Sequence, residues 1–488
     1  MAERLNARTV LNARARPPGY VPEKHGAGIV HLGLGAFHRA HQAVATDDAL
    51  AAEGGDWRIV GSSLRSAGEA DALTAQDGRY TLIVRGAGGT SARVIGAVAQ
   101  AIAGARDKAA LKAALAAPHT RIVSLTVTEK GYGIDRASGG ADRSHPAVAA
   151  DLATPDDPVG VLGHIVAALK ARRAAGLAPF TVLSCDNLPG NGEVVRGAVI
   201  DFAAAVDPAL ADHIARSVAF PSTMVDRITP ARTETTLRDA EAMTGARDEA
   251  AIETEPFTQW VIEDRFPEGR PAWEAGGALF VDHVAPYEAM KLAMLNGTHS
   301  LLAYTGVVAE HPYVRDAMAN PALRALARRH LAAAAATLDP VPGIDLAVYA
   351  DDLVERFDNP HLAHQTYQIA MDGTEKLPQR ILGPAERALS RGEPLRPYAF
   401  ALAAWMRYAL GRTDSGETYA LRDPREAEIE AAVAAGGTPS DLAGRLMRLG
   451  PLRREALLAS EPFVSAVEEI FAAMVTGTMA AAIRAEAG

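Results

Sequence analysis

The chain has little cysteine, little lysine and no long apolar run. Its one cysteine, Cys185, cannot form an intramolecular disulfide, and a structural zinc site built from several thiolates is excluded as well. No apolar stretch approaches the roughly 18 residues that a membrane-spanning helix needs, and the first residues lack the apolar core of a secretory signal. We therefore expect a reducing, cytoplasmic location and no membrane partner.

Net positive charge is also absent, since 59 acidic residues outnumber 49 basic ones and give a formal charge of −10. A protein that coats nucleic acid is normally basic, so no nucleic-acid partner is expected. Only seven of the basic residues are lysines. Lysine can lose its proton near neutral pH and arginine cannot, so the lysines in motif-rich segments are candidates for chemistry: Lys130, Lys291 and Lys376.

With 488 residues, the chain is long enough for two or more domains. Strand-like and helix-like segments alternate in its first part, which predicts a parallel sheet with helices on both faces. Helical patterns then follow one another almost without strands. The sequence predicts an α/β domain over 1–285 and an all-α domain over 286–488. Strands are expected at 28–34, 57–64, 80–85, 92–98, 121–127 and 180–185, and the last helix at 462–484.

A glycine-rich turn follows the first expected strand and precedes a helix. Gly33 would permit the tight turn, and Gly35 would let the backbone approach a pyrophosphate that faces the helix N-terminus. A structural glycine turn is the alternative, because such a motif is not specific by itself. In the position after the first strand, the motif predicts a Rossmann-type cofactor-binding loop formed by Gly33, Leu34, Gly35, Ala36 and Phe37.

His38 occupies the sixth position of the dinucleotide fingerprint, and His41 lies three residues further on. Because no cysteine or carboxylate cluster joins them, we expect a loop-ordering role and no metal site. After the second strand, Glu69 or Asp71 would accept a hydrogen bond from a ribose hydroxyl, whereas Arg65 would suit a 2′-phosphate. The expected cofactor is NAD, with Glu69 as its ribose ligand and NADP left open.

One helical segment carries a lysine, an amide and an imidazole. At about 100° per residue, Asn296 is rotated about 140° from Lys291, with His299 between them at about 80°. Burial lowers an amine's pKa, so Lys291 can take a proton from an alcohol while Asn296 and His299 hydrogen-bond the oxygen. We expect Gly297 to keep the helix surface open for a ligand and Glu288 to relay the proton to solvent.

A second polar group ends the strand expected at 180–185. Asp186 and Asn187 lie there at the carboxyl edge, where open α/β sheets bind ligands, so Asn187 would be another donor to the oxygen. A plain turn is the alternative. Tyr287 and Lys291 also match the Tyr-x-x-x-Lys pair of short-chain dehydrogenases, in which the tyrosine is the base. That pair normally lies in the α/β domain of a much shorter chain.

Six motifs, spread in order over nearly the whole chain, resemble the mannitol dehydrogenase family of polyol-specific long-chain dehydrogenases. They are HLGLGAFHRAHQA at 31–43, SLTVTEKGY at 124–132, SCDNLPGNG at 184–192, MVDRITP at 224–230, QWVIED at 259–264 and MKLAMLNGTHS at 290–300. The resemblance implies a metal-independent NAD(P)-dependent enzyme that interconverts a secondary alcohol and a ketone. It implies that Lys291 is the general acid and base and that Asn187, Asn296 and His299 hydrogen-bond the reacting oxygen. It also implies that Asp226 lies by the pocket.

The segment YQIAMDGTEKLPQR at 367–380 resembles the fructuronate reductase branch, as does Lys130, whereas mannitol-active members carry arginine in place of Gln368. A uronate has a carboxylate, for which Lys376 and Arg380 would supply the counter-charge, with ordinary ion pairing as the alternative. The resemblance thus implies reduction of D-fructuronate to D-mannonate. The fructose/mannitol couple and the oxidation of arabinitol or sorbitol are the alternatives.

The remaining expectations concern partners and other classes of protein. The partner is a small sugar acid or polyol, and the chain is a monomer or a weak homo-oligomer. A zinc-dependent sorbitol dehydrogenase is disfavoured by the single cysteine. A nucleotide-binding sensor without turnover is a further alternative, against which the set of Lys291, Asn296, His299 and Asn187 argues. NAD-preferring mannitol enzymes have acidic residues where this chain has Ala67 and Gly68, which leaves the cofactor's 2′ group undecided.

Overall fold

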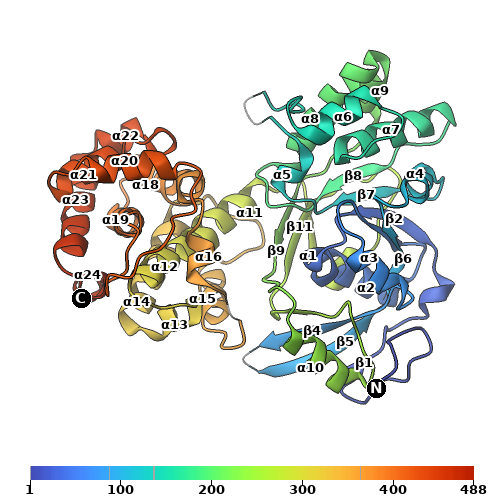
Figure 1. Cartoon of the computed structure of the whole chain (residues 1–488), viewed down its shortest axis with the longest axis horizontal. Helices are drawn as coiled ribbons and strands as arrows, with labels where there is room; N and C mark the ends of the chain where they lie inside the picture. The colour runs from blue at the N-terminus through green and yellow to red at the C-terminus, as the bar shows by residue number, and fades with distance from the viewer. Residues whose placement is uncertain (1, 87, 136–137, 363) are drawn as a thin grey trace. The chain divides into compact units, whose positions relative to one another are not determined.

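The computed structural model describes residues 2–86, 88–135, 138–362 and 364–488. The chain divides into two compact units, Met1–Ala285 and Pro286–Gly488. All the named strands lie in the first unit, and the second consists of helices joined by loops (Figure 1). The predicted fold class, an α/β Rossmann-type part followed by a helical part, is confirmed. No described helix combines the length and the apolar character that crossing a membrane requires.

The central sheet of the first unit has five parallel strands in the order β6-β3-β2-β7-β8. Their bounds are β2 Ala27–Leu32, β3 Arg58–Ser63, β6 Val98–Ala103, β7 Ile122–Leu125 and β8 Thr181–Ser184. Numbered along the chain, this is the 3-2-1-4-5 order of a Rossmann fold. The strand order reverses at β2, so the loop after β2 opens at the switch point where such sheets bind ligands.

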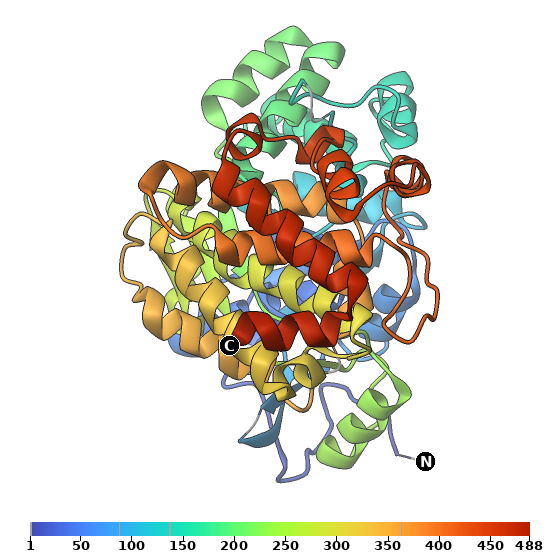
Figure 2. The same ribbon diagram turned by 90° about the vertical axis from the view of Figure 1, so that its left-hand side faces the viewer.

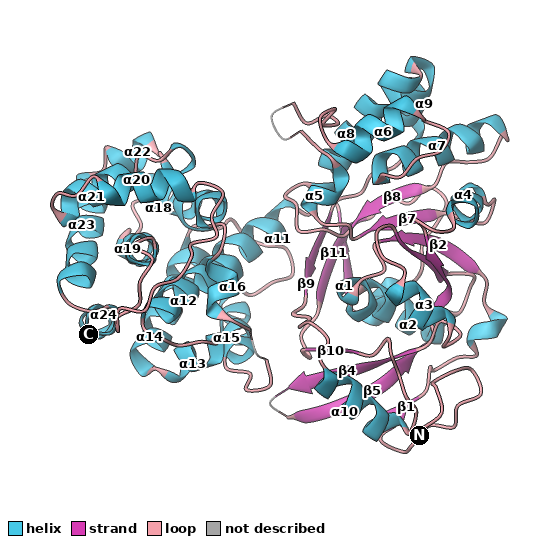
Figure 3. Ribbon diagram, in the orientation of Figure 1, coloured by secondary structure: helices cyan, strands magenta, loops and turns pink. Residues whose placement is uncertain are grey.

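Helices cover both faces of this sheet (Figure 3). One apolar core packs α4 and α6 to α9 on one face, and a second packs α1 to α3 on the other. Both cores are rich in the Val, Ile and Leu side chains of the strands, as expected for a parallel sheet buried on both sides. The helix bounds are α1 Ala36–Ala40, α2 Gln42–Glu53, α3 Gly68–Thr74, α4 Lys108–Ala116, α5 Glu129–Tyr132, α6 Pro146–Ala153, α7 Val161–Ala174, α8 Asn191–Val206 and α9 Pro208–Ser217.

Two smaller sheets complete the first unit. One has the order β1-β5-β4-β10 and the other the order β12-β11-β9. The extended segment predicted at 92–98 is in fact two strands in different sheets, because Gly96 lies against the rings of Pro18 and Pro22 and its N–H donates to Asp47 (2.8 Å). The bounds are β1 Ala15–Arg16, β4 Tyr80–Gly86, β5 Gly89–Ile95, β9 Thr223–Asp226, β10 Ile252–Thr254, β11 Gln259–Glu263, β12 Ala278–Val281 and α10 Glu234–Thr244, with short 3₁₀ turns η1 Pro22–Lys24 and η2 Trp273–Gly276.

The second unit is built around two helices, α12 and α19. Every residue of α12 is buried, and so is every residue of α19 from Tyr398 to Tyr408, so both are core helices rather than amphipathic surface ones. Helix α19 packs against α12 and α23, and α24 packs against α14 (Figure 2, with α23 and α24 in red).

The helices of the second unit have the following bounds: α11 Ala285–Met290, η3 Lys291–Asn296, α12 Gly297–Val308, α13 Val314–Ala319, α14 Pro321–Ala336, α15 Leu346–Phe357, α16 Thr366–Ala370, α17 Gly373–Leu377, η4 Pro378–Leu382, α18 Gly383–Arg391, α19 Arg396–Tyr408, α20 Glu426–Ala434, α21 Pro439–Leu446, η5 Gly450–Leu452, α22 Glu455–Leu458, α23 Glu461–Thr476 and α24 Met479–Ala487. The single helix predicted at 462–484 is wrong. It breaks at Gly477 (φ −110°, ψ −129°), and the Thr478 hydroxyl then caps α24 by accepting from the Ala481 N–H (3.1 Å).

Candidate active site

The loop after β2 is shaped by two glycines with different surroundings. Gly33 has a φ of +107°, and a Cβ there would lie 2.0 Å from the Thr126 carbonyl oxygen, so only glycine fits. A Cβ on Gly35 would meet only the Gly33 carbonyl oxygen, at 3.9 Å, so the space beside it is free. Gly35 is also the N-cap of α1 and offers no capping side chain, which leaves the first helical N–H groups for an anion. The loop therefore fits a dinucleotide pyrophosphate.

Two stacked histidines fix this loop to the sheet. The rings of His31 and His38 lie 3.4 Å apart at 10°. The His31 ring nitrogens contact the Ser124 hydroxyl (2.8 Å) and the Thr126 hydroxyl (2.8 Å). Burial lowers the pKa of His31 to about 3 and holds that of His38 well below its ordinary value, so both rings are neutral. At the sixth fingerprint position a small residue usually lets the helix pack closely on the strand. This chain has His38 there, and its ring stacks on His31 of the strand instead.

A cavity of about 300 Å³ adjoins the loop, and both Glu69 and Arg65 line it. The Glu69 carboxylate is held by Arg39 (2.6 Å) and Arg232 (3.0 Å). Asp71, the other expected ribose ligand, does not line this cavity and pairs instead with an arginine on the exposed surface. Of the two acids, Glu69 is therefore the one placed to meet a ribose. No group of three or more His, Cys, Asp or Glu side chains in the described part of the chain is arranged to hold a metal.

The end of β8 carries one structural residue and one exposed one. The Asp186 carboxylate accepts hydrogen bonds from the N–H groups of Val127 (2.9 Å) and Thr128 (3.0 Å) and from the Tyr132 hydroxyl (2.7 Å). Asp186 thus ties the segment after β7 to the end of β8. The following Asn187 is exposed at the carboxyl edge of the sheet, where a substrate oxygen can reach it.

Asp226 ends strand β9 and is 5% exposed. It lies opposite Gln259 in the antiparallel pairing of β9 with β11. The next residue, Arg227, donates to the Ala40 carbonyl oxygen at the end of α1 (2.6 Å). The MVDR motif therefore joins β9 to the helix that follows the phosphate loop.

The segment of the second unit that carries Lys291, Asn296 and His299 is not a regular α-helix. Residues 291–296 form a π-helical turn between α11 and α12, and the Gly297 N–H donates to the carbonyl of Leu292, five residues back. Such turns widen the helix and are frequent at functional sites. Lys291 and Asn296 are five residues apart, so the wider turn brings them toward the same side. The separation of about 140° calculated from α-helical geometry therefore does not apply to this wider turn.

This segment carries a buried lysine and two buried polar atoms whose hydrogen bonds are not made by the described residues. Lys291 is 7% exposed and His299 is 8% exposed. The Asn296 Oδ1 and the His299 Nε2 are buried and have no hydrogen-bond partner within the described residues. Burial and nearby cations hold the pKa of His299 well below its ordinary value, so the ring is neutral. Because an unmade buried hydrogen bond is costly, these atoms indicate a ligand that completes them.

Gly297 serves packing rather than ligand access, which corrects our expectation for it. A Cβ at this position would lie 2.8 Å from the Arg380 carbonyl oxygen and 2.8 Å from Cε1 of His330. The close approach of a second π-helical turn, η4, and of helix α14 thus requires glycine here. These neighbours support the irregular turn that precedes Gly297.

The two cations expected to face a substrate carboxylate differ in their partners. The Lys376 ammonium donates to the carbonyl oxygens of Ile369 (3.3 Å) and Met371 (2.5 Å) and lies 3.6 Å from Asp372. It is therefore already engaged within the protein. Arg380, in η4, donates to the Ser300 hydroxyl of α12 (3.4 Å), and burial lowers its pKa.

Four further residues singled out in the sequence lie in different surroundings. The Tyr287 hydroxyl donates to the Pro342 carbonyl oxygen (2.7 Å), which occupies it and disfavours a role as catalytic base. Glu288 is half-buried on α11, three residues before Lys291. Gln368 is exposed on α16, and Lys130 is exposed on α5.

Sequence reasoning missed two residues near His299. The His364 ring lies 5.0 Å from the His299 ring, and its buried Nδ1 has no hydrogen-bond partner in the described part of the chain. Arg356, 7% exposed, is close enough to contribute to the lowered pKa values of both histidines. Both residues are more than 50 positions from His299, so no local periodicity could have indicated them.

Most of the chain matches known proteins in sequence. The family models named Mannitol dehydrogenase Rossmann domain and Mannitol dehydrogenase C-terminal domain match residues 27–275 and 283–443. The D-mannonate oxidoreductase of Escherichia coli K12 is 44% identical over 444 residues, covering 90% of this chain and 91% of that protein. The mannitol 2-dehydrogenase of Cereibacter sphaeroides is 42% identical over 459 residues, covering 93% and 96%.

A solved structure agrees with these matches. Pseudomonas fluorescens mannitol 2-dehydrogenase, in a ternary complex with NAD and D-mannitol, aligns with a TM-score of 0.86 and 38% identity over 99% of each chain. The resemblance inferred from the motifs is therefore confirmed, and the chain belongs to the mannitol dehydrogenase family.

Proposed function

We propose that this protein is a reversible NAD-dependent oxidoreductase that reduces the ketone of D-fructuronate to the secondary alcohol of D-mannonate. The observation that carries the proposal is a buried lysine, Lys291, on a π-helical turn with Asn296. Further along the same helix, the buried Nε2 of His299 has no hydrogen-bond partner among the described residues. These are the groups that a carbonyl oxygen needs as it becomes an alkoxide and then an alcohol.

Each group has a distinct role in the reduction. Bound NADH supplies the hydride that adds to the carbonyl carbon. The Lys291 ammonium delivers a proton to the carbonyl oxygen, so the C=O bond becomes CH–OH and the lysine becomes a neutral amine. In the reverse direction this amine removes the alcohol's proton. Asn296, His299 and Asn187 hydrogen-bond the oxygen while its charge develops.

Two acids act around this centre in the proposal. Glu288, one turn before Lys291, passes the proton between the amine and solvent. Asp226 binds a hydroxyl of the sugar and so orients its carbon chain. Glu288 is half-buried and Asp226 is buried. A hydrogen bond to a carboxylate is stronger in such surroundings than in water.

The proposed cofactor binding uses the first unit. Gly33, Leu34, Gly35, Ala36 and Phe37 surround the pyrophosphate, and Glu69 binds the adenosine ribose. A carboxylate at the ribose favours NAD, because it would repel a 2′-phosphate. Arg65 lines the same cavity, so NADP enters the test below as a competitor.

Arg380 favours a uronate over a neutral sugar. A buried guanidinium is stabilised by an anion, and the carboxylate of fructuronate would supply one in bidentate geometry. Lys376 contributes less than the sequence suggested, because carbonyl oxygens already accept from it. The second candidate is the fructose/mannitol couple, which the names of two relatives support. In that reaction Gln368 would bind a hydroxyl.

A substrate and cofactor panel tests the proposal. Purified protein is assayed with NADH and NADPH against fructuronate, tagaturonate and fructose. We expect fructuronate with NADH to have the highest kcat/KM. A much higher kcat/KM for fructose than for either uronate would overturn the substrate assignment and leave the second candidate.

The variant Arg380→Gln sharpens the substrate assignment. Loss of a charge-assisted hydrogen bond should raise the KM for fructuronate at least tenfold and leave the KM for fructose within about twofold. The matched variant Lys376→Gln loses the same charge at a site that contacts only protein, so it should shift both KM values alike. An equal effect of Arg380→Gln on both substrates would contradict a carboxylate contact.

A further inference from the structure

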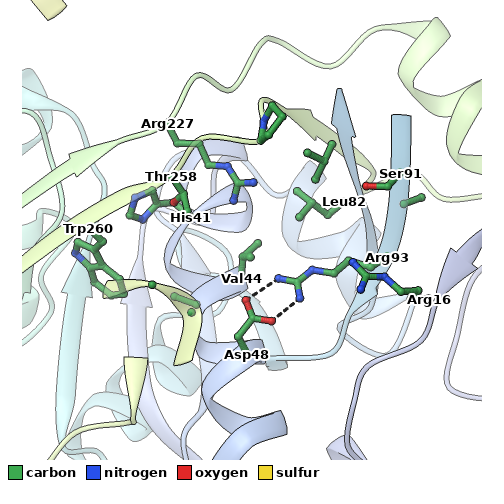
Figure 4. A pocket seen from close by; sticks show the side chains of 16 residues that line it. Arg16, His41, Val44, Asp48, Leu82, Ser91, Arg93, Arg227, Thr258 and Trp260 are labelled. Atoms are coloured by element: carbon green, nitrogen blue, oxygen red, sulfur yellow. Dashed lines mark hydrogen bonds and ion pairs between the residues drawn. The ribbon is translucent and has the colours of Figure 1, made fainter. Parts of the chain in front are cut away.

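A cavity of about 340 Å³ lies in the first unit, apart from the cavity at the phosphate loop (Figure 4). Strands β1, β4 and β5 form one side and helix α2 forms another. The segment around β11 completes the wall. It shares no lining residue with the cavity at the phosphate loop, and none of the groups proposed for catalysis lines it. We propose that this cavity is an effector site for a small phosphate-bearing metabolite.

Its charge is the first reason. Arg16 of β1 and Arg93 of β5 are direct register partners, so two positive side chains lie next to each other. Like charges at such positions repel. Asp48 of α2 forms a two-point ion pair with Arg93 (Figure 4), one contact being 2.9 Å. That carboxylate neutralises one of the two arginines, so an anion beside the exposed Arg16 would neutralise the other.

A third guanidinium, Arg227, enters the wall from the opposite side (Figure 4). It donates to the carbonyl oxygens of Ala40 (2.6 Å) and Glu255 (3.1 Å). Burial lowers its pKa to about 10, and among the charges that act on it the Glu255 carboxylate comes before Arg93 and Asp48. Arg227, Arg93 and Asp48 all line the same cavity. Three guanidinium groups around one lining carboxylate give a cavity that favours a multiply charged anion such as phosphate.

The rest of the wall accommodates the body of a metabolite. Val44 and Leu82 offer apolar surface, and the buried Trp260 indole N–H has no acceptor within the described residues. A volume of about 340 Å³ is within the usual range of small-molecule sites. The combination of arginines, an apolar wall and an unused donor suits a phosphorylated, hydroxylated ligand of hexose size.

An occupant of this cavity would contact the strands that position Asp226, which is why we propose that it acts as an effector. Thr258 and Trp260 line it, and the residue between them, Gln259, is the register partner of Asp226. Arg227 follows Asp226 directly and also binds the last carbonyl of α1, the helix of the phosphate loop. A ligand that engages Arg227 and Trp260 therefore acts on both strands that position Asp226. The proposal that Asp226 binds the sugar makes the KM for the sugar the quantity to follow.

Binding of inorganic phosphate and of glucose 6-phosphate tests the site. Isothermal titration is run on the full chain with and without saturating NADH, which fills the phosphate loop. The test variant is Arg16→Gln, and the matched control is Arg14→Gln, an exposed arginine two residues earlier that does not line the cavity. We expect Arg16→Gln to weaken glucose 6-phosphate binding at least tenfold and Arg14→Gln to leave it unchanged. Circular dichroism confirms that both variants fold.

The outcomes separate the parts of the proposal. Tighter binding of glucose 6-phosphate than of phosphate supports a site for a metabolite, whereas equal affinity reduces it to an anion site. Equal affinity of the two arginine variants, or no binding with NADH present, overturns the site. In steady-state assays we expect glucose 6-phosphate to change the KM for the sugar in the wild type and not in Arg16→Gln. Binding that depends on Arg16 without any change in KM overturns the effector role. If the protein turns over no sugar, the proposed function fails while the binding result still stands.

Discussion

The candidate site of the first unit uses backbone groups, whereas the candidate site of the second unit uses side chains. At the phosphate loop of the first unit, the backbone is the proposed binding surface, and the side chains of His31 and His38 hold the loop in place. In the second unit, side chains on a distorted helix are proposed to carry the chemistry, and two of their buried polar atoms have no hydrogen-bond partner among the described residues. In this proposal a binding site built from backbone is complete before its ligand arrives, whereas the catalytic side chains need the substrate to complete their hydrogen bonds.

The difference has a physical cause. A pyrophosphate spreads its charge over several oxygens, which helix N–H groups match without any side chain. Proton transfer to one oxygen needs one ionisable group at one place. The π-helical turn provides that place, and the packing of η4 and α14 against Gly297 stabilises it. The first unit should therefore be most sensitive to replaced glycines, and the second to replaced polar side chains.

Replacement of Lys291 by methionine gives the largest expected effect. Met keeps most of the buried apolar volume and removes the group proposed to exchange the proton with the substrate oxygen, so kcat should fall about 10³- to 10⁴-fold. The dissociation constant for NADH should stay within about twofold, since the nucleotide loop belongs to the other unit. Steady-state kinetics and NADH fluorescence titration measure the two quantities.

The control for this variant is Lys112→Met, which removes an exposed lysine of α4. It should leave kcat unchanged. If Lys291→Met retained more than about a tenth of the wild-type kcat, the proton would have to come from another group. A collapse of activity in Tyr287→Phe would then favour the tyrosine, despite its hydrogen bond to a carbonyl oxygen.

Two glycines of the phosphate loop form a matched pair. Gly33→Ala places a Cβ 2.0 Å from a carbonyl oxygen at a positive φ, so the free energy of unfolding should drop by about 3 kcal/mol or more. Gly35→Ala meets no protein atom closer than 3.9 Å, so it should fold normally and weaken NADH binding about tenfold or more by occupying the space of the pyrophosphate. Chemical unfolding and NADH titration distinguish the two effects.

The KM for the sugar is the internal control for Gly35→Ala. Gly35→Ala should leave the KM for the sugar nearly unchanged at saturating NADH, because the methyl group lies in the nucleotide space. If Gly35→Ala bound NADH as tightly as the wild type, the pyrophosphate would lie elsewhere and the loop would be a structural turn.

The sequence predicts those features of the sites that depend on residues close together in the chain. Four strands of the parallel sheet and the loop at Gly33 are readable, because strand runs and glycines act on their immediate neighbours. The fifth strand, β6, is not predicted as a separate strand. The π-helical turn is not, since 291–296 has the periodicity of an ordinary helix and only the backbone hydrogen bonds distinguish the two. The approach of His364 to His299 is a long-range packing result, so no local pattern indicates it. The partners of Lys376 are close in the sequence, but two of them are backbone carbonyl oxygens, which no side-chain pattern reveals.

The smallest expected effect concerns acid stability and the histidine behind the catalytic turn. His330 is fully buried, contacts the Thr298 hydroxyl (3.2 Å), and burial lowers its pKa to about 4. Because an unfolded histidine titrates near 6.5, the unfolded state binds more protons below that pH, and stability falls as the pH drops from about 6.5 to 4. At about 1.4 kcal/mol per pKa unit, His330 costs the fold roughly 2–3 kcal/mol at pH 4.5.

The variant His330→Gln measures this cost, since glutamine keeps a polar side chain and cannot titrate. Between pH 7 and 4.5 its free energy of unfolding should fall by about 2–3 kcal/mol less than that of the wild type, in urea titrations followed by circular dichroism. The control His119→Gln alters an exposed histidine of the first unit and should match the wild type. Equal acid sensitivity of His330→Gln and the wild type would mean that the helical unit stays folded with His330 protonated. The core behind the π-helical turn would then admit water, and the buried polar atoms of Asn296 and His299 would be hydrated rather than reserved for substrate.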